Sequence, residues 1–338
     1  MKNEIIEMEY YLIEGEKKNN LGDVLQGMVA KQFLNPNSIC INREKIKSGD
    51  YKPGLVIANG WFQHNTDEFP FNEKLNPIYV SFHVAKSELL KKQETRDHLK
   101  AYSPIGCRDI QTKYLLLFWG IPAYFSGCLT MTSSSLINNE IQSTNEILLV
   151  DNIDHQIPES IKNKLSGILD TEIIHLNHNP NSTQLSFNDY VKNESESMKH
   201  LLERYQNAKL IITSKLHVAL PCLSLNKKVL FIHPNPNDKR LSILKKYIKI
   251  YHYNEIEKWK TIPELNFKQR KFIAQAKSIE TIVQTSIKMK SNSLKAPVNF
   301  KYKMVSITTK INSKILNLLR ILIINSPFCP IKFKQTFS

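Results

Sequence analysis

Residues 211–222 read Ile211-Ile212-Thr213-Ser214-Lys215-Leu216-His217-Val218-Ala219-Leu220-Pro221-Cys222, and the rest of the chain is organised around this segment. The apolar run from Leu210 to Ile212 predicts a buried strand of an α/β sheet. Ser214 is a suitable N-cap, and a short helix is expected over 217–225. A strand that leads through a cap into a helix is the repeating unit of α/β proteins.

Lys215 and His217 lie near the first turn of that expected helix. Free backbone N–H groups and the positive end of the helix dipole favour an anion at this point. Ligands of α/β sheets bind at the carboxyl ends of strands, where a cation close to a titratable imidazole suits an active site. The alternative is a solvated lysine and a packed histidine.

Strands and helices alternate along the rest of the chain, as in parallel sheets. Apolar runs predict further strands at 9–13, 55–58, 78–82, 123–125, 147–150, 172–176 and 228–232. Helices are expected at 24–33, 87–102, 110–119, 159–170, 187–206, 242–250 and 268–288, the last of which is expected to cross back over the domains. A Ser- and Asn-rich stretch at 133–145 predicts a linker. We expect an N-terminal domain over 1–140, a C-terminal domain over 141–290 and a tail over 291–338.

The segment before the first expected helix is Asn20-Leu21-Gly22-Asp23. Asp23 is expected to cap the helix that starts at Val24. A strand, a glycine-containing loop and a helix begin a nucleotide-like half-domain, but the full G-x-G-x-x-G pattern is absent, and dinucleotide binding has little support. A plain helix cap is the alternative for Gly22 and Asp23.

Two strand ends in the N-terminal half carry candidate residues. Asn59-Gly60 predicts a turn, and the two aromatic residues that follow, Trp61 and Phe62, either form the floor of a sugar site or pack. His83 stands at the end of the strand at 78–82, where it either faces the ligand crevice or serves as a hydrogen-bonded structural residue. Further along, Asp109 is expected to cap the helix at 110–119 and to present Arg108 just before it.

The charge of the chain is uneven. Its 338 residues carry a net charge of +15, and residues 281–338 contain ten basic and no acidic side chains. Most of the excess therefore lies in the tail rather than in a groove through the fold, so we expect no nucleic-acid partner. The basic, apolar stretch at 315–324 either lies on an anionic membrane surface as an amphipathic helix or packs on the body or on a partner.

The cysteines are scattered, without a C-x-x-C pair, which argues against a zinc knuckle or a dithiol redox motif. His175 and His178 lack a clear third ligand, and no metal site is expected. The N-terminus has no apolar signal core, and no run of about 18 apolar residues exists. We therefore expect a cytoplasmic protein, which is peripheral to the inner face of the membrane if the tail lies on that surface and not if the tail packs on the body or on a partner. The five cysteines are Cys40, Cys107, Cys128, Cys222 and Cys329.

Several short segments together resemble the polysaccharide pyruvyl transferase family over about residues 9–285. They are Asn20-Leu21-Gly22-Asp23, Ile105-Gly106-Cys107-Arg108-Asp109, the stretch at 123–130, Thr213-Ser214-Lys215-Leu216-His217 and Asp238-Lys239-Arg240. The resemblance implies an α/β fold of two Rossmann-like domains facing across a cleft, as in the glycosyltransferase B arrangement.

The resemblance also implies transfer of a pyruvyl group from phosphoenolpyruvate to a sugar, which gives a cyclic ketal on a surface polysaccharide or its precursor. Phosphoenolpyruvate is then the donor substrate, no cofactor is expected, and the acceptor is a glycan or a lipid-linked sugar. The family's Ser-Arg-Leu-His signature falls on residues 214–217, where Lys215 replaces the arginine. The charge is kept, but the bidentate fork is lost.

Phosphoenolpyruvate carries a carboxylate and a phosphate, so its pocket needs cations and N–H donors. Lys215 and Arg108 are expected to supply the two anion sites. His217 is the candidate general acid, because a bound anion favours the protonated imidazole. His83 or Asp23 is expected to activate the sugar hydroxyl. The substrate-binding set is completed by Ser214, Asn20 and Asn59.

Two other functions compete with this one. A nucleotide-sugar-dependent glycosyltransferase of the same two-domain plan would hold a diphosphate with a similar basic residue and helix start. A non-catalytic glycan-binding or assembly factor would bind a donor without turning it over.

Overall fold

The computed structural model describes residues 9–14, 21–137, 140–151, 156–176 and 187–295. The chain divides into two compact units, one over 7–286 and one formed by 1–6 and 287–338. Both sheets belong to the unit over 7–286. The tail from 296 lies outside the described residues, and so does its expected membrane contact. The domain boundaries stay a prediction.

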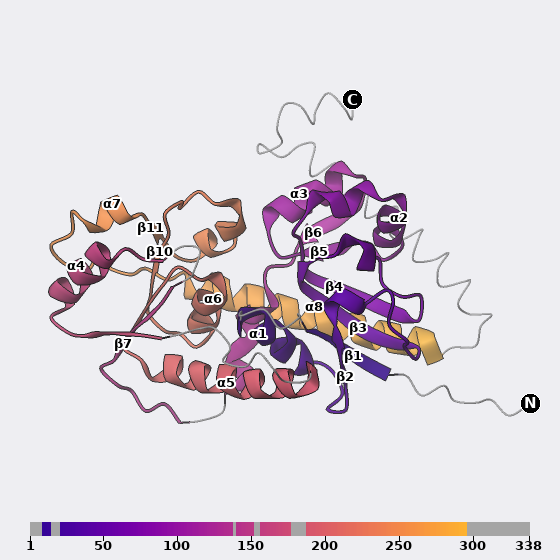
Figure 1. Ribbon diagram of the computed structural model, residues 1–338, viewed down its shortest axis with the longest axis horizontal. Helices are drawn as coiled ribbons and strands as arrows, with labels where there is room; N and C mark the ends of the chain where they lie inside the picture. The colour runs from indigo at the N-terminus through magenta and orange to yellow at the C-terminus, as the bar shows by residue number, and fades with distance from the viewer. Residues whose placement is uncertain (1–8, 15–20, 138–139, 152–155, 177–186, 296–338) are drawn as a thin grey trace, which may run out of the picture. The chain divides into compact units, whose positions relative to one another are not determined.

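The first sheet has six parallel strands in the order β2-β1-β3-β4-β5-β6 (Figure 1). The strands are β1 (Glu9–Glu14), β2 (Ile39–Asn42), β3 (Gly54–Phe62), β4 (Leu75–Val84), β5 (Ile105–Cys107) and β6 (Ala123–Phe125). The helices between them are α1 (Leu21–Lys31), η1 (Arg43–Lys45), η2 (Thr66–Glu68), η3 (Ser87–Lys91), α2 (Gln93–Ala101) and α3 (Ile110–Phe118). β2 and β5 were not expected from the sequence.

The second sheet has five parallel strands in the order β11-β10-β9-β7-β8. The strands are β7 (Ile147–Val150), β8 (Ile173–His175), β9 (Leu210–Thr213), β10 (Val229–Ile232) and β11 (Ile250–Tyr251). η4 (Leu129–Leu136) precedes β7 in the chain. The helices between the strands are α4 (Glu159–Leu169), α5 (Phe187–Asn207), α6 (Leu216–Ser224), η5 (Lys239–Ser242) and η6 (Leu244–Lys246), and α7 (Tyr253–Ile256) and α8 (Gln269–Lys295) follow β11. The predicted α/β fold class with two Rossmann-like sheets is confirmed.

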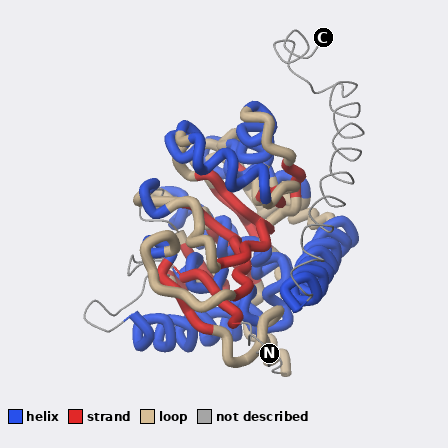
Figure 2. The backbone as a smooth tube through the Cα atoms, turned by 90° about the vertical axis from the view of Figure 1, so that its right-hand side faces the viewer, coloured by secondary structure: helices blue, strands red, loops and turns tan. Residues whose placement is uncertain are grey.

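The central strands are apolar because both faces of each sheet are covered, as the helices on either side of the strands show (Figure 2). Residues 55–58 of β3 and all four residues of β7 and β9 are buried. Leu55, Val56, Ile57 and Ala58 are each 0% exposed. The apolar runs that predicted these strands therefore reflect burial from two sides.

Each sheet has one point at which the strand order reverses. β1 lies between β2 and β3, and β7 lies between β8 and β9. The connections that leave the central strand at such a point diverge, so a crevice opens outside the carboxyl ends of the two neighbouring strands. In the first sheet this point lies at the start of α1 and the end of β3, and in the second it lies at the start of α6.

The turn predicted at Asn59-Gly60 is wrong, because β3 continues through these residues to Phe62. Gly60 has a φ of 90°, and the register with β4 shifts between Ala58 and Gly60. The glycine therefore makes a bulge within the strand rather than an end to it. Phe62 is 0% exposed in the hydrophobic core, whereas Trp61 remains partly exposed.

Replacing Gly60 by alanine is expected to lower the free energy of unfolding by about 1–3 kcal/mol. Its φ is positive, and an added Cβ would lie 2.3 Å from Gln26 Oε1. Urea denaturation measures the change. Gly167→Ala is the matched control, because a Cβ at this exposed position of α4 meets no atom within 4 Å, and alanine should stabilise the helix by up to about 1 kcal/mol. Equal stability of the two variants would contradict this account of the bulge.

Three expected helix details are wrong. Asp23 is the third residue of α1 rather than its cap. The N-cap of α6 is Lys215 rather than Ser214, and the backbone N–H of Lys215 donates to Thr213 Oγ1 at 3.0 Å. The helix expected at 242–250 is broken into η5, η6 and β11, because Ile250 pairs with Phe231 of β10.

The last helix, α8, crosses back to the first half of the chain, as expected. Gln275 Nε2 donates to the carbonyl of Ser126 at 2.6 Å. A Cβ at Gly127, whose φ is 88°, would lie 3.3 Å from Ile279. Residues after β6 are thus held by a helix that follows the second sheet.

Candidate active site

The carboxyl end of β4 carries a buried histidine that is hydrogen-bonded to an aspartate. His83, which is 7% exposed, contacts Asp109 through Nδ1 and Oδ2 at 2.6 Å. Thr112 Oγ1 lies 3.1 Å from the same nitrogen and donates to Asp109 Oδ2 at 3.1 Å. Because the carboxylate accepts a hydrogen bond from Nδ1, the proton of neutral His83 resides there and Nε2 keeps its lone pair.

Burial lowers the pKa of His83, and the positive charges of Arg108 and Arg240 lower it further. The hydrogen bond to Asp109 and the charge of that carboxylate raise it, but the net shift is downward. His83 is therefore a neutral imidazole at pH 7, oriented by a carboxylate. This is the arrangement of a general base.

Asp109 also caps α3, as the sequence predicted. Its Oδ1 accepts from the backbone N–H of Thr112 at 2.8 Å, while Oδ2 faces His83. Burial raises the pKa of Asp109, but the hydrogen bond and charge of His83, the Thr112 N–H and Arg108 outweigh it, so the net shift is downward. Asp109 is therefore a carboxylate at neutral pH.

Arg108 is a buried cation at the end of β5. It is 6% exposed, and its backbone N–H donates to Phe82 at 2.9 Å. The side-chain Nε is shielded from solvent and meets no hydrogen-bond acceptor within the described part of the chain. A buried guanidinium with an unsatisfied N–H is costly, and a bound anion would relieve that cost.

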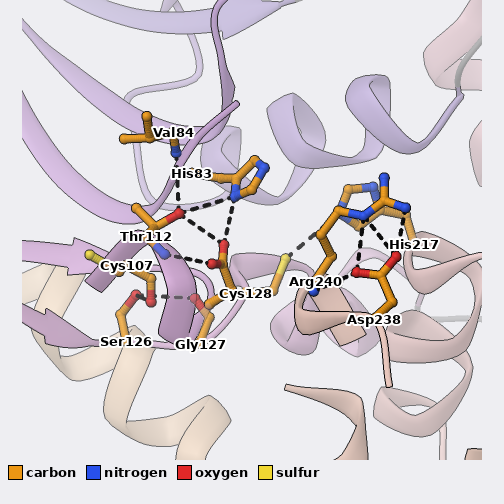
Figure 3. Close-up of polar contacts among 11 residues, drawn as sticks. His83, Val84, Cys107, Thr112, Ser126, Gly127, Cys128, His217, Asp238 and Arg240 are labelled. Carbon is orange, nitrogen blue, oxygen red and sulfur yellow. Dashed lines mark hydrogen bonds and ion pairs between the residues drawn. The ribbon is translucent and has the colours of Figure 1, made fainter. Parts of the chain in front are cut away.

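His217, in the first turn of α6, comes to the same place. Its Nε2 lies 3.9 Å from Cys128 Sγ (Figure 3). Burial raises the pKa of Cys128, although the charge of nearby Arg108 lowers it in part, so the thiol is neutral at pH 7. Cys128 thus lies between the guanidinium of Arg108 and the imidazole of His217, which joins the two halves of the chain at one site.

η5 adds another arginine. Arg240 binds Asp238 through a fork, with Nη2 at 2.7 Å and Nε at 3.0 Å from Oδ2 (Figure 3). Its charge acts on His83, so the two side chains are neighbours across the site. Lys246 of η6 lies 3.4 Å from the centre of the Phe125 ring, at the end of β6. The site therefore gathers cations from both sheets.

The structure brings together three of the predicted residues, His83, Arg108 and His217. Asp23 and Asn59 lie instead at the strand-order reversal of the first sheet. Asn59 Nδ2 donates to the Gln26 carbonyl at 2.9 Å, which ties β3 to α1. The remaining predicted residues are Lys215 and Ser214, at the start of α6, and Asn20, which lies outside the described residues.

Five residues that the structure adds to this site were not among the predicted site residues: Asp109, Thr112, Cys128, Arg240 and Lys246. Asp109 was expected only as a helix cap. A helix cap uses only one oxygen of the aspartate carboxylate, which leaves the other oxygen free to contact a histidine. The positions of Asp109 and His83 in the sequence do not show that these two residues meet. Cys128 was expected only as one of the scattered cysteines and as part of the segment at 123–130, and its neighbour His217 is 89 residues away in the sequence.

The sequence profile that describes polysaccharide pyruvyl transferases matches residues 20–236, well over half of the 338 residues. The chain belongs to this family. The match includes the residues of the candidate active site from His83 to His217 and ends just before η5. The polysaccharide pyruvyl transferase resemblance inferred from the short segments is confirmed. A comparison with curated proteins found no match.

Solved structures of similar fold were also found. One is a functionally uncharacterised protein from Klebsiella pneumoniae, 12% identical, with a TM-score of 0.43 over 70% of this chain and 88% of that chain. Another is the UDP-GlcNAc 2-epimerase of Methanocaldococcus jannaschii in complex with UDP-GlcNAc and UDP, 13% identical, with a TM-score of 0.42 over 82% and 99%. The UDP-GlcNAc 2-epimerase of Neisseria meningitidis, 10% identical, has a TM-score of 0.43 over 83% and 100%.

The described residues include neither a membrane-spanning helix nor a metal-binding group of side chains. None of their helices combines the length and apolarity needed to cross a membrane. No group of three or more His, Cys, Asp and Glu side chains among them is arranged to hold a metal ion.

Proposed function

We propose that this polysaccharide pyruvyl transferase family member moves the pyruvyl group of phosphoenolpyruvate onto two hydroxyls of one sugar, in a surface polysaccharide or its precursor. The observation that carries the proposal is the buried Arg108, with an unsatisfied Nε, beside the neutral His83 and its carboxylate partner. An anionic donor and a hydroxyl acceptor need such a pair of groups side by side.

The donor is held by charge. Phosphoenolpyruvate carries a carboxylate and a phosphate, and Arg108 offers a desolvated N–H donor to one of them. Arg240 and Lys215 supply further positive charge, the latter at the start of α6, where the helix dipole also favours an anion. With lysine at 215, this charge acts as a point rather than as a fork.

In the reaction, His83 Nε2 accepts the proton of the first sugar hydroxyl while its oxygen adds to C2 of the enol. His217 donates a proton to C3, which becomes the methyl group. Phosphate leaves as the C2–O bond breaks, and the second hydroxyl closes the ring at C2. Of the two hydroxyl protons, one balances the proton placed on C3 and the other leaves with phosphate. The cations stabilise the charge that develops on the leaving group.

Between the two candidate bases, His83 is favoured over Asp23. Asp23 is engaged by Gln26 Nε2 at 2.9 Å and lies 3.5 Å from Arg43 Nη2. Its carboxylate is thus already engaged by two protein partners, and it lies at the strand-order reversal rather than beside Arg108. His83, in contrast, is neutral at pH 7 and holds its proton on the nitrogen that faces Asp109.

The test is turnover with defined donors. The purified protein is incubated with phosphoenolpyruvate and surface polysaccharide that mild acid has freed of ketals, and phosphate release is followed together with glycan mass. We expect phosphate release and a mass increase of one pyruvate less one water. Release of a nucleoside diphosphate from a nucleotide sugar would instead support a glycosyltransferase, and binding without turnover of either donor would support an assembly factor.

The pH dependence of kcat/KM follows from the lowered pKa of His83. A base works only when deprotonated, so activity should fall as pH drops through the folded-state pKa, which lies below the ordinary value of about 6.5. Because unfolded chains bind this proton at higher pH, the folded state should also lose stability as pH falls below about 6.5.

Arg240→Gln tests the cause of that acid limb. Removal of one positive charge should move the midpoint toward higher pH, because Arg240 lowers the pKa of His83. An acid limb centred above pH 7 in the wild-type enzyme would contradict the assignment of His83 as the base.

A further inference from the structure

A second group of polar and aromatic side chains lies where the strand order of the first sheet reverses. Trp61 is near the end of β3, Arg43 follows β2, and Asp23 is in the first turn of α1. His64 comes just after β3. These four residues, which we call the Trp61 cluster, stand at the carboxyl ends of strands on both sides of β1, where α/β sheets bind ligands.

The cluster is built around a buried cation. Arg43 is 4% exposed, and its guanidinium lies 5.3 Å from the centre of the Trp61 ring. Asp23 Oδ2 lies 3.5 Å from Arg43 Nη2, and Glu44 Oε1 lies 3.4 Å from Arg43 Nε. Held from two sides, the arginine orients the indole ring.

Trp61 and His64 together present aromatic surface. Their ring centres are 4.0 Å apart, with an angle of 53° between the planes. Trp61 is partly exposed and His64 is exposed, whereas the next residue in β3, Phe62, is 0% exposed. The sequence did not decide whether Trp61 and Phe62 form the floor of a sugar site or pack in the core. In the structure Phe62 packs in the core, whereas Trp61 lies at the surface.

The cluster adjoins the candidate base. Trp61 is paired in register with His83 of β4, so the two residues are direct neighbours on adjacent parallel strands. Neighbouring strands are about 4.8 Å apart, and paired residues project from the same face of a sheet. A ring bound at Trp61 therefore places its hydroxyls close to His83.

We infer that the Trp61 cluster binds the acceptor sugar. The apolar C–H face of a pyranose packs on the aromatic surface of Trp61 and His64, and the carboxylate of Asp23 accepts hydrogen bonds from sugar hydroxyls. Arg43 positions the indole. That the sugar bound here is an acceptor rests on the proposed function, but sugar binding itself does not.

The experiment compares Trp61→Ala and Trp61→Phe with the wild-type protein. The probe is the acid-treated surface polysaccharide described above, cut to oligosaccharides. We expect Trp61→Ala to raise KM for the oligosaccharide about tenfold, with Kd for phosphoenolpyruvate unchanged, and Trp61→Phe to fall between. Thermal unfolding confirms that both variants are folded.

Trp119 provides the matched control. It is the C-cap of α3, and the guanidinium of Arg96 lies 4.7 Å from the centre of its ring. Like Trp61, it is therefore a tryptophan next to an arginine. Trp119→Phe should leave KM for the oligosaccharide unchanged. An unchanged KM in folded Trp61→Ala, with wild-type turnover, would overturn the inference and leave the proposed function standing.

Direct binding separates the two failures. If the wild-type protein does not turn over phosphoenolpyruvate, the proposed function fails, and oligosaccharide binding is measured by calorimetry alone. Weaker binding by Trp61→Ala than by Trp119→Phe would still support the cluster as a sugar site. Equal binding by the two variants, or no binding by the wild-type protein, would exclude it.

Discussion

Asp109→Asn is expected to lower kcat by about 10²–10⁴-fold while the protein stays folded. The carboxylate holds the proton of His83 on Nδ1 through a contact of 2.6 Å. An asparagine amide can donate to Nδ1 instead, which moves the proton to Nε2 and blocks the base. Steady-state turnover of phosphoenolpyruvate and thermal unfolding are the two measurements.

Asp109→Ser separates the catalytic role from the structural one. Serine and asparagine both cap helices nearly as well as aspartate, so α3 should remain capped in each variant. Neither offers an anion to His83, and both should lose turnover with little loss of stability. Wild-type kcat in either variant would show that the carboxylate does not act through His83.

His217→Ala should lower kcat by about 10²–10⁴-fold while the protein still binds phosphoenolpyruvate. In the proposed reaction this imidazole donates the proton that makes C3 a methyl group, a step that the acceptor cannot supply. Donor affinity is expected to persist, because Arg108, Arg240 and Lys215 remain. Calorimetric titration with phosphoenolpyruvate and single-turnover phosphate release test the two halves of this expectation.

His200→Ala is the control for that substitution. His200 lies on α5, away from the candidate active site, and its side chain is 81% exposed. Its loss should change neither kcat nor the affinity for phosphoenolpyruvate. Turnover at the wild-type rate in His217→Ala would remove this residue from the mechanism. Loss of donor binding together with turnover would make it a binding residue instead of an acid.

The strands of both sheets were largely predictable, because burial from two faces makes them apolar runs. The exceptions have physical causes. Gly60 looks like a turn residue, but its positive φ serves a bulge within β3. The helix expected at 242–250 failed because pairing of Ile250 with β10 outweighs local helical preference.

Individual site residues were predictable where they sit at strand ends, as His83 does. Their partners were not. The contact between Cys128 and His217 joins residues that are 89 positions apart, and the neighbourhood of Arg240 and His83 depends on how η5 meets α3. Such contacts arise from packing, which strand and helix patterns do not encode.

Asp109 uses one oxygen to begin a helix and the other to orient a histidine. Folding and chemistry are therefore coupled through a single side chain. A substitution of Asp109 by another good helix cap would keep the stability of the protein but would remove the carboxylate that orients His83. A substitution that changed the reaction would also remove the cap of α3. Position 109 should therefore tolerate fewer substitutions than it would if the residue only capped α3 or only oriented His83.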